Sequence, residues 1–102
     1  MSNKTTTFGN TQISYYKANH DFTSSTSYTF STGLLKSLTI QLYGTWVASV
    51  ALSGSIDGTN FQTLDSAKTS NGYWSIENEN WSSYKITVTY TSGTVSVICE
   101  GR

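Results

Sequence analysis

The stretch GTWVASVALSGSIDGTNF, residues 44–61, decides the fold class because it has the pattern of one long strand followed by a turn. In an extended chain, alternate side chains point to opposite faces. One face of this stretch then holds Trp46, Ala48, Val50, Leu52, Gly54 and Ile56. The Asp-Gly pair at 57–58 ends the run, since Gly adopts positive φ without steric cost and Asp bonds to nearby amides. This stretch therefore predicts a half-buried strand.

Shorter segments with the same alternation occur along the rest of the chain, at 11–17, 27–31, 38–42, 61–64, 73–76, 81–90 and 94–100. No segment of ten or more residues has helical periodicity. We therefore expect an all-β fold with little or no helix, a single antiparallel β-sandwich of about seven or eight strands, either a jelly roll or Ig-like.

Short turn sequences separate these segments. Gly44-Thr45 and Thr91-Ser92-Gly93 are each expected to close a hairpin between the flanking strands. Residues 19–21, which include His20, are expected to form a connection.

The chain is long enough for one domain. Residues 1–10 are polar and are expected to form an N-terminal arm with Phe8 as its one anchor, and residues 11–102 the sandwich. The expected core is Leu38, Ile40, Trp46, Val50, Leu52, Ile86, Val88, Val95, Val97 and Cys99.

Composition restricts the function. Ser and Thr together supply 34 of the 102 residues, and six Lys or Arg balance six Asp or Glu without clustering. A nucleic-acid partner is not expected, because phosphate binding needs a basic stripe. A membrane partner is not expected either, because no apolar stretch reaches the roughly 20 residues of a membrane span. The opening MSNKTTTFGN has no apolar signal-peptide core, so we expect synthesis in the cytoplasm.

No pattern for catalysis or metal binding is present in the sequence. The chain has one histidine, His20, with no nucleophile elbow to accompany it, and one cysteine, Cys99, which faces the expected core. The turn at Asp57 lacks the repeated acidic residues of a calcium loop. We expect a protein that is not an enzyme and has no cofactor.

Aromatic residues gather around one polar loop, at Tyr73, Trp74, Trp81 and Tyr84. Exposed Trp and Tyr rings stack on sugar rings, while nearby Asn and Glu supply hydrogen bonds. Large aromatics also pack the corner of a small sandwich that has no disulfide. Tyr73, Trp74 and Trp81 are therefore candidates either for glycan stacking or for packing.

Several apolar residues are expected on the outer faces of the strands. Tyr43, Val47, Ala51 and Ile98 point away from the predicted core, and Phe8 lies in the arm. Apolar groups outside a small domain are typical of a subunit that docks on a lattice or associates with itself. These five residues are the candidate contacts with other subunits.

Residues 44–61, together with WSSYKITVTYTSGTVSVICEGR at 81–102, resemble the small β-sandwich virion proteins of tailed bacteriophages. The resemblance covers about 40 residues and consists of a strand ending in GSIDGTNF and a late strand pair around TSGTVSV. It implies a capsid decoration, head-fibre or tail component and supplies no catalytic residue.

The resemblance leads to an expected function. We expect a capsid decoration protein in the virion, bound to the major capsid protein or other virion subunits and prone to self-association. A tail or fibre accessory module is the alternative within the virion. A carbohydrate-binding module is the alternative from another class.

Overall fold

Alternation of apolar and polar residues produces eight β-strands in the computed structural model, which describes residues 15–102. The strands are β1 (Tyr16–Phe22), β2 (Thr26–Ser31), β3 (Ser37–Tyr43), β4 (Trp46–Ser55), β5 (Gln62–Thr63), β6 (Gly72–Glu77), β7 (Ser83–Gly93) and β8 (Val95–Gly101). No helix occurs in this range. The arm predicted at residues 1–10, with Phe8, lies outside the described residues.

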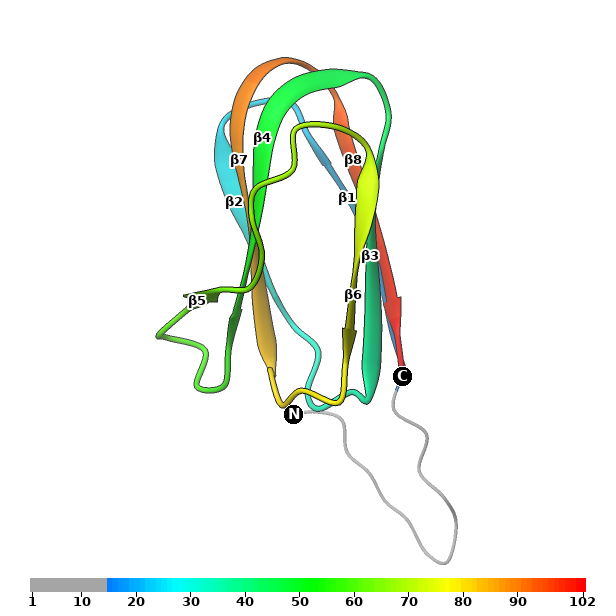
Figure 1. Cartoon of the computed structure of the whole chain (residues 1–102), viewed down its shortest axis with the longest axis vertical. Helices are drawn as coiled ribbons and strands as arrows, with labels where there is room; N and C mark the ends of the chain where they lie inside the picture. The colour runs from blue at the N-terminus through cyan, green and yellow to red at the C-terminus, as the bar shows by residue number, and fades with distance from the viewer. Residues whose placement is uncertain (1–14) are drawn as a thin grey trace, which may run out of the picture.

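The strands form two four-stranded antiparallel sheets that face each other (Figure 1). Sheet A has the order β1-β8-β3-β6, and sheet B has the order β2-β7-β4-β5. Every connection except β4–β5 crosses from one sheet to the other. Eight strands in this order form a jelly roll, so the predicted sandwich is confirmed and the jelly-roll alternative is the correct one.

Both predicted hairpins are wrong. β3 and β4 belong to different sheets, and so do β7 and β8, so the connections at 44–45 and at Thr94 are arches between sheets, and residues 91–93 lie in β7. Gly44 and Gly93 have the expected positive φ of 102° and 87°, which suits an arch as well as a hairpin. The turn residues indicate only that the chain bends. Which strands pair depends on which apolar faces meet, and the apolar faces of these strands meet across the core.

The two arches pack against each other at the same end of the sandwich. The Thr94 amide donates to the Thr45 carbonyl at 3.0 Å. A Cβ added to Gly93 would lie 2.2 Å from the Thr45 carbonyl oxygen. Gly93 is therefore required by this close approach as well as by its backbone conformation.

The inner faces of both sheets form one core. Burial of Cys99 and of every predicted core residue except Trp46 is confirmed, and Trp46 is half-buried. Seven further apolar side chains outside the predicted core are also buried, namely Phe22, Phe30, Leu35, Leu42, Trp74, Ile76 and Tyr84.

The predicted alternation fails at the end of β4. Ile56 was expected on the inner face but is 70% exposed, because the strand stops at Ser55. The buried Ser55 hydroxyl donates to Asp57 Oδ1 at 2.8 Å and accepts from the Gly58 amide at 2.9 Å. These bonds turn the chain and point Ile56 outward.

His20 lies within β1, so the predicted connection at residues 19–21 is wrong. Its ring stacks on Tyr28 of β2 with centroids 4.1 Å apart and meets the edge of Phe22 at 4.5 Å. Tyr16 stacks on Phe30 in the same region. An aromatic ladder therefore closes the side of the sandwich between β1 and β2.

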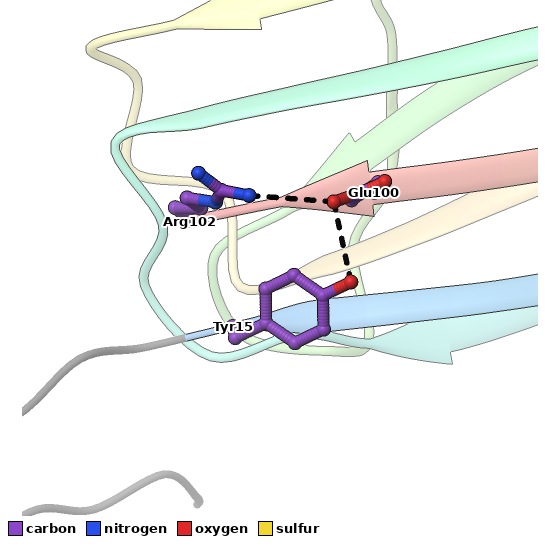
Figure 2. Close-up of polar contacts among 3 residues, drawn as sticks. All are labelled: Tyr15, Glu100 and Arg102. Carbon is purple, nitrogen blue, oxygen red and sulfur yellow. Dashed lines mark hydrogen bonds and ion pairs between the residues drawn. The ribbon is translucent and has the colours of Figure 1, made fainter.

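The start of β1 is tied to the end of β8 by three side chains (Figure 2). The Tyr15 hydroxyl donates to Glu100 Oε2 at 3.2 Å, and the Arg102 guanidinium lies 3.5 Å from the same oxygen. Arg102 also lies over the Tyr15 ring, 5.8 Å from its centroid. The described chain therefore begins beside its C-terminus at the outer edge of sheet A.

Candidate functional site

A row of three outward side chains crosses the outer face of sheet A, from Ile98 on β8 through Gln41 on β3 to Tyr73 on β6. β3 alternates strictly, so Thr39, Gln41 and Tyr43 point outward. The register places Gln41 opposite Ile98 of β8 on one side and Tyr73 of β6 on the other. This pairing brings together side chains that are more than 20 residues apart in the sequence.

Tyr43 and Tyr73 are diagonal neighbours on β3 and β6 and border a shallow groove of about 450 Å³. Tyr43 is 41% exposed and Tyr73 is 64% exposed, so both rings have free surface. The groove is lined mainly by Thr39, Gln41, Tyr43, Asn71, Gly72 and Tyr73. Apart from the two phenols, the lining has no ionisable group.

Asn71 fixes one end of this groove. Its Oδ1 accepts from Trp46 Nε1 at 2.7 Å, and its Nδ2 donates to the Gly44 carbonyl at 2.9 Å. These bonds connect the segment before β6 to the arch between β3 and β4. The groove wall is thereby held by side-chain bonds as well as by the sheet.

A second cavity, a cleft of about 220 Å³, lies on the other side of β6, at the edge between the two sheets. Tyr73 lines both cavities. Leu52, Leu64 and Trp74 form the apolar part of the cleft, and its acidic residues are Asp65 and Glu79. Trp74 Nε1 is buried and has no hydrogen-bond partner among residues 15–102.

The structure separates the side chains predicted to stack on glycans. Tyr73 is exposed, but Trp74 is only 5% exposed and packs in the core. Trp81 is half-buried against Gly54 and Leu64, and its Nε1 donates to Glu79. A sugar ring in solvent therefore cannot reach Trp74, and it can contact only part of the Trp81 ring.

Tyr84, the fourth aromatic of the predicted cluster, is also a core residue. Burial raises the pKa of its phenol to about 12, and the charge of Glu79 acts in the same direction. It packs against Phe30, with ring centroids 5.6 Å apart. This residue therefore supports the packing interpretation.

The candidate contact residues fall on two opposite faces. Tyr43 and Ile98 lie on the outer face of sheet A, while Val47 and Ala51 lie on the outer face of sheet B. Val47 is 58% exposed, and Ala51 and Ile98 are half-buried. No single flat partner can contact all four at once, and Phe8 is outside the described residues.

The two outer faces differ in chemistry. On sheet B, β2, β4 and β7 present short side chains outward, mostly Ser, Thr and Ala, with Val47 at one end. Its one charged side chain is Lys85, whose ammonium lies over the Phe61 ring at 4.5 Å. On sheet A the outward charges are Lys17, Asp21, Glu77 and Glu100.

Residues 15–102 contain no cluster of three His, Cys, Asp or Glu side chains arranged to hold a metal ion. Within the same range, no helix is long and apolar enough to cross a membrane. The Cys99 thiol is buried, and this burial raises its pKa to about 11.

Gln41 and Asn71 could not be predicted from the sequence as parts of a site. Their role depends on β3 lying next to β6, which the order of strands along the chain does not reveal. The outward direction of Tyr73 could have been found, because Trp74 and Ile76 share the opposite face in the alternating sequence GYWSIE.

Comparison with known proteins supports the fold. No family model matches the chain, and no curated protein matches it. Among solved structures, the chain is similar to the SPBc2 prophage-derived protein YomS, with a TM-score of 0.66 and 19% identity over 90% of this chain and 98% of that one. It is also similar to PliG, a periplasmic inhibitor of g-type lysozyme from Aeromonas hydrophila, with a TM-score of 0.54 and 13% identity over 85% and 84%.

A protein from Bacillus endospore appendages, which form disulfide-linked pili, gives a TM-score of 0.49 at 12% identity over 85% of each chain. On the match to YomS, the chain is a β-sandwich similar in structure to a prophage-derived protein.

Proposed function

We propose that this protein is a non-enzymatic structural subunit of a phage virion, a capsid decoration protein that docks on the outside of the head. The outer face of sheet B is the observation that carries this proposal. It is built from short uncharged side chains, with Val47 exposed and Ala51 half-buried among them. The structural similarity to a prophage-derived protein supports the same class.

Desolvation favours sheet B over sheet A as the docking face. A partner on sheet A would have to desolvate Asp21 and Glu77, which costs free energy unless each carboxylate is paired, and also the exposed pair of Glu100 with Arg102. On sheet B the one charge, Lys85, already contacts an aromatic ring. Short side chains also let a flat partner approach the backbone of the sheet closely.

When one subunit makes several contacts with the shell, its overall binding is strong even though each single contact is weak. When a subunit bridges two capsid proteins, its second contact forms at high effective concentration, so modest affinity for each is enough. The arm at residues 1–10, with Phe8, is proposed to add a further contact to a neighbouring subunit, since an extended segment can pair with a free sheet edge. Tyr43 and Ile98 then face away from the shell.

A binding assay with virion parts tests this proposal. Purified protein is mixed with heads that lack it and, separately, with isolated tails, and each mixture is sedimented. We expect the protein to sediment with heads. Sedimentation with tails alone would replace this proposal with the tail or fibre accessory alternative, and sedimentation with neither would refute a virion role.

A further inference from the structure

The groove between Tyr43 and Tyr73 has the composition of a sugar-binding surface. Two partly exposed aromatic rings stand on neighbouring strands, with Gln41 and Thr39 between and beside them. We propose that this groove binds a neutral oligosaccharide, with one sugar ring in contact with Tyr43 and Tyr73 and the chain continuing across β6 toward the edge cleft.

The chemistry of the lining selects the ligand class. A pyranose has apolar C–H faces that pack on aromatic rings and hydroxyls that need hydrogen-bond partners. Gln41 is exposed on β3, and its carboxamide has two donors and an acceptor that sugar hydroxyls can use. Thr39 adds a hydroxyl on the same strand.

The absence of charge in the lining argues for a neutral ligand. An anionic ligand would be desolvated without an opposite charge in the groove. A cation near this lining is Lys68, whose side chain runs beside Gly72 and whose ammonium lies over the Trp74 ring at 5.3 Å. This ammonium is already in contact with a π face.

The backbone of the groove is held by hydrogen bonds. Both tyrosines belong to strands of one hydrogen-bonded sheet, and Asn71 is held by Trp46 and by the Gly44 carbonyl. A preformed site loses less conformational entropy on binding than a site built on loops.

The edge cleft extends the site beyond one sugar. Tyr73 is the wall shared by the groove and the cleft, so a chain that lies on Tyr73 reaches both. In the cleft, carboxylates of Asp65 and Glu79 can accept bonds from sugar hydroxyls. We therefore expect tighter binding of oligosaccharides than of the corresponding monosaccharide.

This site does not depend on the proposed head docking. The groove lies on the outer face of sheet A, opposite the face assigned to the shell, so a docked subunit would leave it open to solvent. Binding by the isolated protein therefore tests the groove alone, and failure to bind sugar leaves the docking result unaffected.

An array of neutral and acidic glycans tests the proposal. The neutral set is cello-, chito-, manno- and galacto-oligosaccharides, and the acidic set is sialylated and uronate-containing glycans. We expect binding within the neutral set, with amide chemical-shift changes in the wild-type protein confined to the groove and the cleft, which are lined by residues 39–43, 52, 64–65, 71–76 and 79. Binding to no neutral glycan, or only to acidic ones, overturns the proposal.

Substitutions then test whether the rings of Tyr43 and Tyr73 contact the sugar. Tyr43→Ala and Tyr73→Ala should each weaken binding by about tenfold, while Tyr43→Phe and Tyr73→Phe keep the stacking face and lose less. Tyr15→Ala is the matched control, because Tyr15 is an exposed tyrosine of the same domain outside the groove. Equal affinity for the wild-type protein and both alanine variants contradicts the site, as does a shift map that lies elsewhere.

Discussion

Trp46 Nε1 donates a 2.7 Å hydrogen bond to Asn71 Oδ1, joining the start of β4 to the segment that precedes β6. Asn71 also donates to the Gly44 carbonyl at 2.9 Å. One side chain therefore connects the β3–β4 arch, the outer strand of sheet A and a strand of sheet B. The groove beside Tyr43 depends on this connection for its shape.

Asn71→Ala should destabilise the domain by about 1 to 2 kcal/mol, because it removes two side-chain hydrogen bonds at a partly exposed site. The midpoint of urea denaturation, followed by tryptophan fluorescence, measures this loss. Ser70→Ala, at the exposed neighbouring position, is the control and should change stability by less than about 0.5 kcal/mol. Equal midpoints for the two variants would show that the Asn71 bonds do not stabilise the arch.

Gly54→Ala should destabilise by about 1 to 3 kcal/mol through overpacking. A Cβ at Gly54 would lie 2.9 Å from Trp81 Cδ2 and 3.0 Å from Leu64 Cδ1, so the indole must move. Gly72→Ala is the control, since its Cβ would meet only the flexible Lys68 side chain, at 3.7 Å. Thermal denaturation compares the two, and a Gly54→Ala protein as stable as Gly72→Ala contradicts the close packing of Trp81.

Asp57 makes the 55–60 turn sensitive to acid. Its carboxylate accepts bonds from the backbone amides of Asn60 and Thr59 and from the Asn60 and Ser55 side chains, and these bonds hold its pKa well below the usual range. Because the folded pKa is lowered, the stabilisation is complete above the unfolded pKa of about 3.9 and is lost as pH falls below it.

The test is the Asp57→Asn variant, whose side chain cannot ionise. It should be less stable than the wild type at pH 7, and the difference should shrink as the pH is lowered below about 4. Urea denaturation at pH 7, 4 and 3 measures both effects. A difference in stability that stays constant over this range would be inconsistent with the assigned role of Asp57.

Cys99 should react slowly with thiol reagents in the folded protein. The side chain is buried, its Sγ lies 3.7 Å from the Ala18 carbonyl oxygen, and burial raises its pKa to about 11. Because the thiolate is the reactive form, iodoacetamide at pH 8 should modify native protein about a hundredfold more slowly than urea-unfolded protein. Similar rates in both states would place the thiol at the surface.

The strands of this domain could be predicted from alternation, whereas their partners could not. Residues 46–55 form β4 as expected, and Val50 and Leu52 are fully buried. The turns at Gly44 and Gly93 were assigned to hairpins because their residues suit a tight bend, but a bend is compatible with strands in one sheet or in two. The distinction lies in which apolar faces meet, and this depends on the whole set of strands.

The candidate site was predicted only in part for the same reason. Tyr43 and Tyr73 were both identified as notable, but for different functions, because nothing in the sequence places β3 beside β6. His20 was assigned to a loop because Asn and Asp flank it. In the structure Asn19 and Asp21 are the outward residues of β1, and His20 is the inward residue that stacks on Tyr28.

The most direct test of the central claim is whether a charge on the outer face of sheet B abolishes head binding. Val47→Asp places a carboxylate on the proposed docking face, and Thr39→Asp places one at an exposed site on the opposite face. We predict that the Thr39→Asp protein sediments with heads like the wild type, while the Val47→Asp protein stays in the supernatant. Head binding retained by Val47→Asp and lost by Thr39→Asp would contradict the assignment of sheet B as the docking face.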